Sequence, residues 1–246
     1  MITAKDFILL PFTPDLTEGG IAYACRSLNY TYNRMSGLPY ARLRRIVGGV
    51  AVELAFRHHL TNQDVPFDVN SASPFTEPDR YDVSLGGHRC DIKSFLIARR
   101  QQISDIRRDL SVLLKAPALI PSDHFAAQIS LPPRQRIELD GTFFSLAYVH
   151  AKQIPSARIG VRSPVRKETY LIQSTERGNI WLYGMDIWLT GYISHEEFRH
   201  KAKHVPEGSR VFQYNVTRTK NLGVQVTELH PLGDLFENVK SWESQH

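Results

Sequence analysis

PDRYDVSLGGHRCDIKS, residues 78–94, contains two short runs of alternating polarity on either side of a Gly86-Gly87 pair. Both glycines can adopt positive φ without steric cost, so the pair predicts a two-residue loop between two antiparallel strands. With that loop in place, Asp82 on the first strand faces Asp91 on the second. The stretch therefore predicts a hairpin whose register brings two carboxylates opposite each other.

The two faces of this hairpin differ in chemistry, because successive side chains of a strand point to opposite faces. The apolar face predicts a core contact and carries Val83, Leu85, Cys90 and Ile92. The polar face carries Asp82, Ser84, Arg89, Asp91 and Lys93. Opposed like charges destabilise a strand pair by about 0.2–1 kcal/mol. The aspartates therefore favour a shared divalent cation held by oxygen ligands, with Lys93 placed to stabilise negative charge or orient a water. A hydrated surface hairpin without a ligand is the alternative.

A third carboxylate lies in a predicted helix over residues 41–60. The apolar residues at helical spacing are Ile46, Val50, Phe56 and Leu60, and Glu53 lies among them. A carboxylate buried without a partner costs several kcal/mol, so Glu53 needs one. It either pairs with Arg57 at i+4 or points toward the two aspartates as a third acidic group.

This arrangement resembles the PD-(D/E)xK nuclease superfamily. Asp82 matches the first acidic position of that motif, and Asp91 with Lys93 matches the second in its less common Asp form. Asp79 completes a literal Pro-Asp pair but lies three residues too early to face Asp91. The spacing from Gly49 to Glu53 is similar to the helix pattern that often supplies a further acid in the superfamily.

The resemblance implies an α/β protein with a restriction-endonuclease-like core, in which helices flank a mixed central β-sheet, followed by a C-terminal α+β elaboration. It implies Asp82, Asp91 and Glu53 as ligands of Mg²⁺, for which Mn²⁺ can substitute, and Lys93 as a further catalytic residue. Gln128, on a predicted strand over residues 125–131, is an accessory candidate.

The implied activity is metal-dependent hydrolysis of phosphodiester bonds in double-stranded DNA by a homodimer, in restriction or anti-phage defence. A DNA repair or recombination nuclease, an RNase of the same fold, and a nucleic-acid-binding module without catalysis are the alternatives.

The composition is compatible with a nuclease but does not by itself indicate one. The chain has 246 residues and a net charge of +5, which suits one large domain with a local nucleic-acid surface. Two cysteines without metal-ligand spacing favour a reduced, cytoplasmic setting. The sequence contains no run of about 18 apolar residues, so no association with a membrane is expected. A predicted helix over 99–115 could either approach phosphates or present a solvated face; its basic residues are Arg99, Arg100, Arg107 and Arg108.

The remaining pattern divides the chain into a nuclease core over 1–150 and an extension over 151–246 that packs on the core for recognition or dimerisation. Another predicted helix covers residues 13–28. A further one starts from a capping box at Ser194 and extends to His204, so that His200 and His204 would lie one turn apart on it. Further predicted strands cover 65–69, 142–150, 167–174, 211–216 and 223–229. The tail from Glu237 is predicted to be polar and frayed.

Overall fold

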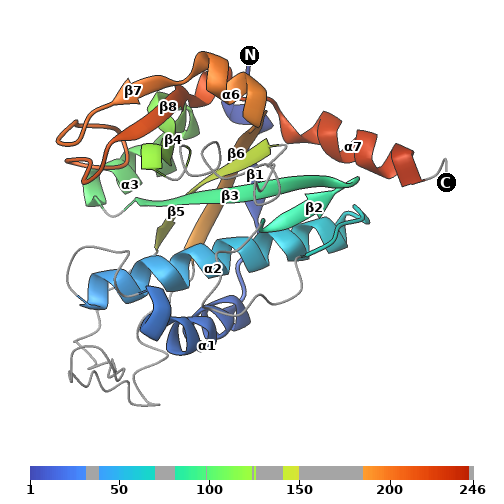
Figure 1. Cartoon of the computed structure of the whole chain (residues 1–246), viewed down its shortest axis with the longest axis horizontal. Coiled ribbons are helices and arrows are strands. Elements are labelled where there is room, and N and C mark those ends of the chain that lie inside the picture. Colours follow the sequence, from blue (N-terminus) through green and yellow to red (C-terminus); the bar gives the residue numbers. More distant parts are fainter. Residues whose placement is uncertain are drawn as a thin grey trace.

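A five-stranded mixed sheet runs through the centre of the computed structural model, with helices on its faces (Figure 1). The structure describes residues 1–31, 39–69, 81–97, 99–123, 125, 141–149 and 185–243. The strand order is β1–β6–β5–β3–β2, with β3 and β5 parallel and the other neighbours antiparallel. The strands are β1 Ile8–Leu10, β2 Val83–Leu85, β3 His88–Ile97, β5 Gly141–Val149 and β6 Met185–Ser194. The predicted class, a mixed sheet flanked by helices, is confirmed.

The hairpin of β2 and β3 has the predicted register. Val83 pairs with Cys90 and Leu85 with His88, and the two glycines between them have φ values of 54° and 82°. On the predicted core face, Val83 is 0% exposed and Cys90 is 6% exposed. A local glycine signal therefore sets the pairing of the strands that carry the candidate site.

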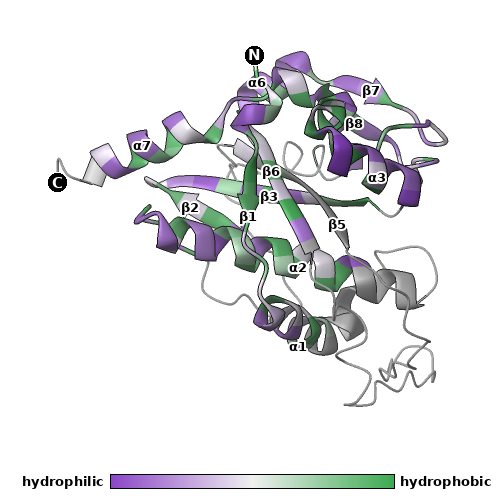
Figure 2. Cartoon of the chain, turned by 180° about the vertical axis from the view of Figure 1, so that it is seen from behind, coloured by the Kyte–Doolittle hydropathy of each residue, from purple (hydrophilic) through white to green (hydrophobic). Residues whose placement is uncertain are grey.

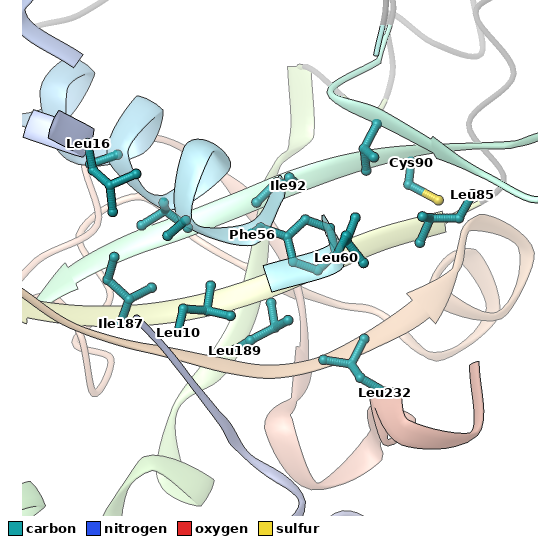
Figure 3. Close-up of a cluster of buried hydrophobic side chains, with 14 of the residues drawn as sticks. Leu10, Leu16, Phe56, Leu60, Leu85, Cys90, Ile92, Ile187, Leu189 and Leu232 are labelled. Atoms are coloured by element: carbon teal, nitrogen blue, oxygen red, sulfur yellow. The ribbon is translucent and has the colours of Figure 1, made fainter. Parts of the chain in front are cut away.

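Two helices, α1 Pro14–Thr31 and α2 Pro39–Asn62, cover one face of the sheet (Figures 1 and 3). Of the predicted α2 stripe, Ile46, Phe56 and Leu60 are buried, and they join the hairpin in one core cluster. A Cβ at Gly20 of α1 would lie 2.7 Å from the carbonyl oxygen of Val47, so glycine there permits close contact between the helices.

The opposite face carries a second core cluster and a three-stranded sheet in the order β4–β8–β7. The elements on this side are α3 Arg100–Arg108, η2 Leu110–Lys115, β4 Pro117–Pro121, α6 His195–Lys201, β7 Lys203–Val205 and β8 Asn221–Gln225. The prediction of one helix over 99–115 is wrong at Asp109. Its side chain accepts a hydrogen bond from the Ser111 amide at 2.9 Å and thereby starts η2.

Several boundaries in the C-terminal region differ from the prediction. His204 lies in β7, so it does not share a helix with His200. Residues 211–216 form no strand, and β8 is followed by the short helix η4 Val226–Glu228. At 65–69 a single bridge joins Asp68 to Ser84. The predicted strand over 167–174 and most of 125–131, including Gln128, fall outside the described residues.

The C-terminal region also contributes to the central sheet, since β6 lies between β1 and β5. The last helix, α7 Leu232–Glu243, includes residues 237–243 of the tail predicted to be frayed. That prediction is wrong because Phe236 and Val239, at helical spacing, are buried against the core of α2. Among the described residues, no helix combines the length and apolar character needed to cross a membrane.

Replacing Phe236 with alanine tests the packing of α7. Its ring lies 6.2 Å from that of Phe56 and is 5% exposed, so Phe236→Ala should lower the free energy of unfolding by about 3–5 kcal/mol. Glu237→Ala is the matched control, because that side chain is 76% exposed and makes only a surface ion pair with Lys240. Denaturant unfolding measures both; equal stability of the two variants would show that α7 is not part of the core.

Candidate active site

The candidate site lies where β2 stops and β3 continues. β2 pairs only with the first three residues of β3, and Asp82 lies directly before β2. The Asp82 amide donates to the Cys90 carbonyl at 3.0 Å, and its carboxylate oxygen Oδ2 accepts from the Ile92 amide at 2.6 Å. The side chain thus supplies the acceptor that a longer β2 would provide from its backbone. This contact fixes Asp82 beside the residue before Ile92, which is Asp91.

Asp91 and Lys93 project from the face of β3 opposite Ile92, as the alternation of a strand requires. The Lys93 ammonium forms an ion pair with Oδ2 of Asp91, and the two side chains are 24% and 15% exposed. Burial alone would lower the pKa of Lys93, but the charges of Asp91, Asp82 and Glu53 outweigh it and raise that pKa. Lys93 is therefore held in its protonated form. Figure 2 shows the same strand turning from hydrophilic beside β2 to hydrophobic toward α3.

Asp82 experiences the opposite effect. Burial, followed by the charges of Glu53 and Asp91, raises the pKa of the Asp82 carboxyl well above its usual range, against a smaller lowering by Lys93. The four predicted residues from α2, the turn before β2 and the middle of β3 therefore lie within electrostatic reach of one another. The structure brings them together as the sequence predicted, while their catalytic roles stay predictions.

Helix α2 is held close to β3 at this point. A Cβ added at Gly49, one turn before Glu53, would lie 3.8 Å from the hydroxyl oxygen of Ser94 on β3. One turn after Glu53, the Arg57 guanidinium donates to the Asp82 carbonyl at 2.9 Å. The sequence offered Arg57 only as a partner for Glu53, and its contact with the Asp82 backbone was missed because that contact depends on the tertiary fold. Arg57 ties the helix to the turn that carries the first aspartate.

The oxygen donors of these residues are of the kind that a hard cation binds. Within the described ranges, no three His, Cys, Asp or Glu side chains are arranged as a metal-binding group. Three ionised carboxylates beside the Lys93 ammonium and the Arg57 guanidinium would leave an excess of one negative charge, which adds to burial, the larger cause, in raising the pKa of Asp82. Carboxylate oxygens are the ligands that Mg²⁺ and Mn²⁺ prefer, so these residues fit such an ion by chemistry.

The four predicted arginines lie elsewhere. Arg99 is half-buried immediately before α3, six residues beyond Lys93, which corresponds to roughly 20 Å along an extended strand. Arg100, Arg107 and Arg108 are exposed on α3, and Arg108 lies 3.8 Å from Asp105. The structure does not bring these side chains to the carboxylates, so any phosphate they contact is distant from the acidic centre.

Comparisons of the chain with protein-family models, with curated proteins and with solved structures found no match. The geometry of the residues around Asp82 therefore carries the functional argument by itself.

Asp82→Asn should stabilise the protein at neutral pH in the absence of divalent ions. Asparagine can still accept the Ile92 hydrogen bond but removes a carboxylate that Glu53 and Asp91 repel. For a chain of this size, each kcal/mol of relief corresponds to a rise of roughly 2–4 °C in Tm. Thermal unfolding with EDTA measures the change, and Glu18→Gln, at an exposed position of α1, is the control.

The pH dependence should follow from the same shift. A carboxyl whose pKa is raised on folding stabilises the protein below its unfolded pKa, about 3.9, and loses that contribution as pH rises through its folded value. The Tm advantage of Asp82→Asn over the unsubstituted chain should therefore grow as pH rises toward neutrality. A constant or shrinking difference would contradict this account of Asp82.

Proposed function

We propose that the protein is a metal-dependent nuclease of the restriction-endonuclease-like fold that hydrolyses phosphodiester bonds in DNA. The observation that supports this proposal is the convergence of Glu53, Asp82 and Asp91 with a protonated Lys93 beside the start of β2. The cluster has three carboxylates beside two cationic side chains, Lys93 and Arg57. The surplus of acid is the feature that a divalent cation would balance.

Each residue has a distinct part in this proposal. Glu53, Asp82 and Asp91 would hold Mg²⁺ through their carboxylate oxygens. The bound ion supplies a water of lowered pKa and stabilises charge on the phosphate. Lys93 keeps its ammonium beside Asp91 and offers it to the phosphate oxygens as negative charge develops. The bonds from Asp82 to Ile92 and from Arg57 to Asp82 hold the carboxylates in place before substrate binds.

The biological setting that accompanies this proposal is restriction or anti-phage defence, with double-stranded DNA as substrate and a homodimer in which each subunit cuts one strand. The basic excess of the chain supports a polyanionic partner, since a net charge of +5 favours association with phosphates.

A nucleic-acid-binding module without catalysis is the second candidate, and one observation favours it. Asp91 already has Lys93 as an ion-pair partner, and in the part of the chain that the structure describes no three acidic or metal-ligating side chains form a ready metal site. A binding module needs the basic surface but not the carboxylates. The two candidates therefore differ in their response to divalent ions.

Lys93→Ala should lower DNA cleavage by at least about a hundredfold, because it removes the charge that faces the scissile phosphate. Cleavage of supercoiled plasmid with Mg²⁺, Mn²⁺ or EDTA measures the effect, with thermal unfolding as the check on folding. Lys115→Ala, which removes an exposed lysine of η2, is the matched control and should cut like the unsubstituted protein. Robust Mg²⁺-dependent cutting by Lys93→Ala would contradict the assignment.

Divalent ions should also stabilise the folded chain independently of any substrate. At a concentration of 100 times Kd, binding adds about 2.7 kcal/mol to the free energy of unfolding, which is roughly 5–10 °C in Tm. Glu53→Gln should reduce the shift produced by Mn²⁺, whereas Glu18→Gln on the exposed side of α1 should keep it. A chain whose Tm does not respond to Mn²⁺ would favour the binding module instead.

A further inference from the structure

A pair of aromatic residues lies close to the proposed catalytic lysine: Phe95 on β3, and Tyr214, which packs against it. Phe95 follows Lys93 by two residues, about 7 Å along the strand, and points to the same side. The ring of Tyr214 packs edge-on against Phe95, with centroids 6.0 Å apart and an interplanar angle of 73°. Phe95 is buried, while Tyr214 remains 37% exposed. One aromatic thus supports another that remains partly exposed.

Tyr214 belongs to the segment 206–220, which joins β7 to β8 and lies beside α3 in Figure 1. Thr217, 3% exposed, holds the base of this segment: its amide donates to the Ser209 carbonyl and its hydroxyl to the Pro206 carbonyl. Nearer the tip, the buried Gln213 donates to the Pro117 carbonyl at 2.5 Å. These bonds anchor the segment without the tyrosine ring.

A second side chain fixes the tip from α3. The Gln102 amide donates to the carbonyl of Phe212, and the backbones of Val211 and Tyr214 exchange hydrogen bonds at 3.1 and 3.2 Å. Tyr214 is therefore presented on a supported turn, which lowers the entropy that a ligand must overcome to bind it. Its exposure does not follow from a loosely held loop.

The segment that carries Tyr214 is rich in basic residues. Between residues 203 and 220 the sequence has one acidic residue, Glu207, and four exposed basic residues, which are Lys203, Arg210, Arg218 and Lys220. Tyr214 is only partly exposed, and its partial burial raises the pKa of the phenol to about 12, with Arg45 of α2 acting in the opposite direction. The phenol therefore stays neutral at physiological pH. A neutral aromatic side chain on a segment rich in lysine and arginine is the chemistry that binds bases and phosphates of an unpaired nucleic-acid strand.

We propose that Tyr214 is a positioning residue that stacks an unpaired base of the nucleic-acid substrate beside the phosphate bound at Lys93. This inference rests on the proposed nuclease function and replaces the fully paired duplex named there by a substrate with an unpaired nucleotide. A base inside a duplex is already stacked on both faces and must be unstacked before a side chain can receive it. The favoured substrate is therefore a strand with an unpaired nucleotide at the cleavage position, such as a single strand or an overhang at the end of a duplex.

The test is binding of fluorescent oligonucleotides in EDTA, measured by anisotropy, so that cleavage plays no part. Tyr214→Leu keeps an apolar contact with Phe95 but has no aromatic face. It should weaken single-strand binding about 5- to 150-fold, the range expected for one stacked base. Tyr214→Phe should bind like the unsubstituted chain, as should Val216→Ala, which alters another exposed apolar side chain of the same segment. A blunt duplex should bind all four proteins alike.

An abasic position identifies stacking as the cause. Moving one abasic site along the strand should find a position at which Tyr214→Leu no longer lowers affinity, because the base it would stack is absent. Parallel series in DNA and RNA identify the sugar. Equal single-strand affinity of Tyr214→Leu and the unsubstituted chain would overturn the inference and leave the nuclease proposal standing. Failure of the unsubstituted chain to bind any strand or duplex would overturn both.

Discussion

An amide at the edge of a sheet needs an acceptor, and at Ile92 that acceptor is a carboxylate rather than a backbone carbonyl. The short β2 makes this necessary, because its three residues pair with β3 only as far as Cys90. Asp82 closes the hairpin by donating to Cys90 and accepting from Ile92. Asp82, directly before β2, thereby limits the pairing of that strand and places a carboxylate against the middle of β3.

That contact has an electrostatic cost. A carboxylate that accepts from Ile92 lies near Asp91, the preceding residue of β3, and near Glu53 on α2. Burial, followed by these two charges, raises the pKa of Asp82 well beyond its usual range. A neutral side chain in place of one of these acids would remove part of this repulsion. The three acids outnumber the two cationic side chains, Lys93 and Arg57, and a divalent ion would convert their remaining repulsion into coordination.

The sequence predicted the parts of this arrangement that local chemistry determines. The hairpin register follows from two adjacent glycines, and the position of Glu53 follows from helical spacing around it. Local signals can also be overlooked: Asp109 before Ser111 is a capping pair that divides the predicted helix over 99–115. The contact of Tyr214 with Phe95 had no such signal, because it joins β3 to a turn that becomes its neighbour only when the second sheet assembles.

Helix α2 runs along β3 between the carboxylates and Tyr214. Glu53 acts on Asp82 near the start of β3, Gly49 lies beside Ser94, and Arg45 acts on Tyr214 near the end of the strand. Helix and strand therefore run alongside each other in opposite directions. The eight residues from Arg45 to Glu53 set a separation of about 12 Å along the helix axis. Since both elements are regular and packed in the core, neither end can move without the other. In the proposed function, a nucleic-acid strand bound at the carboxylates and extending along β3 would meet Tyr214 at the interval that this alignment of helix and strand sets.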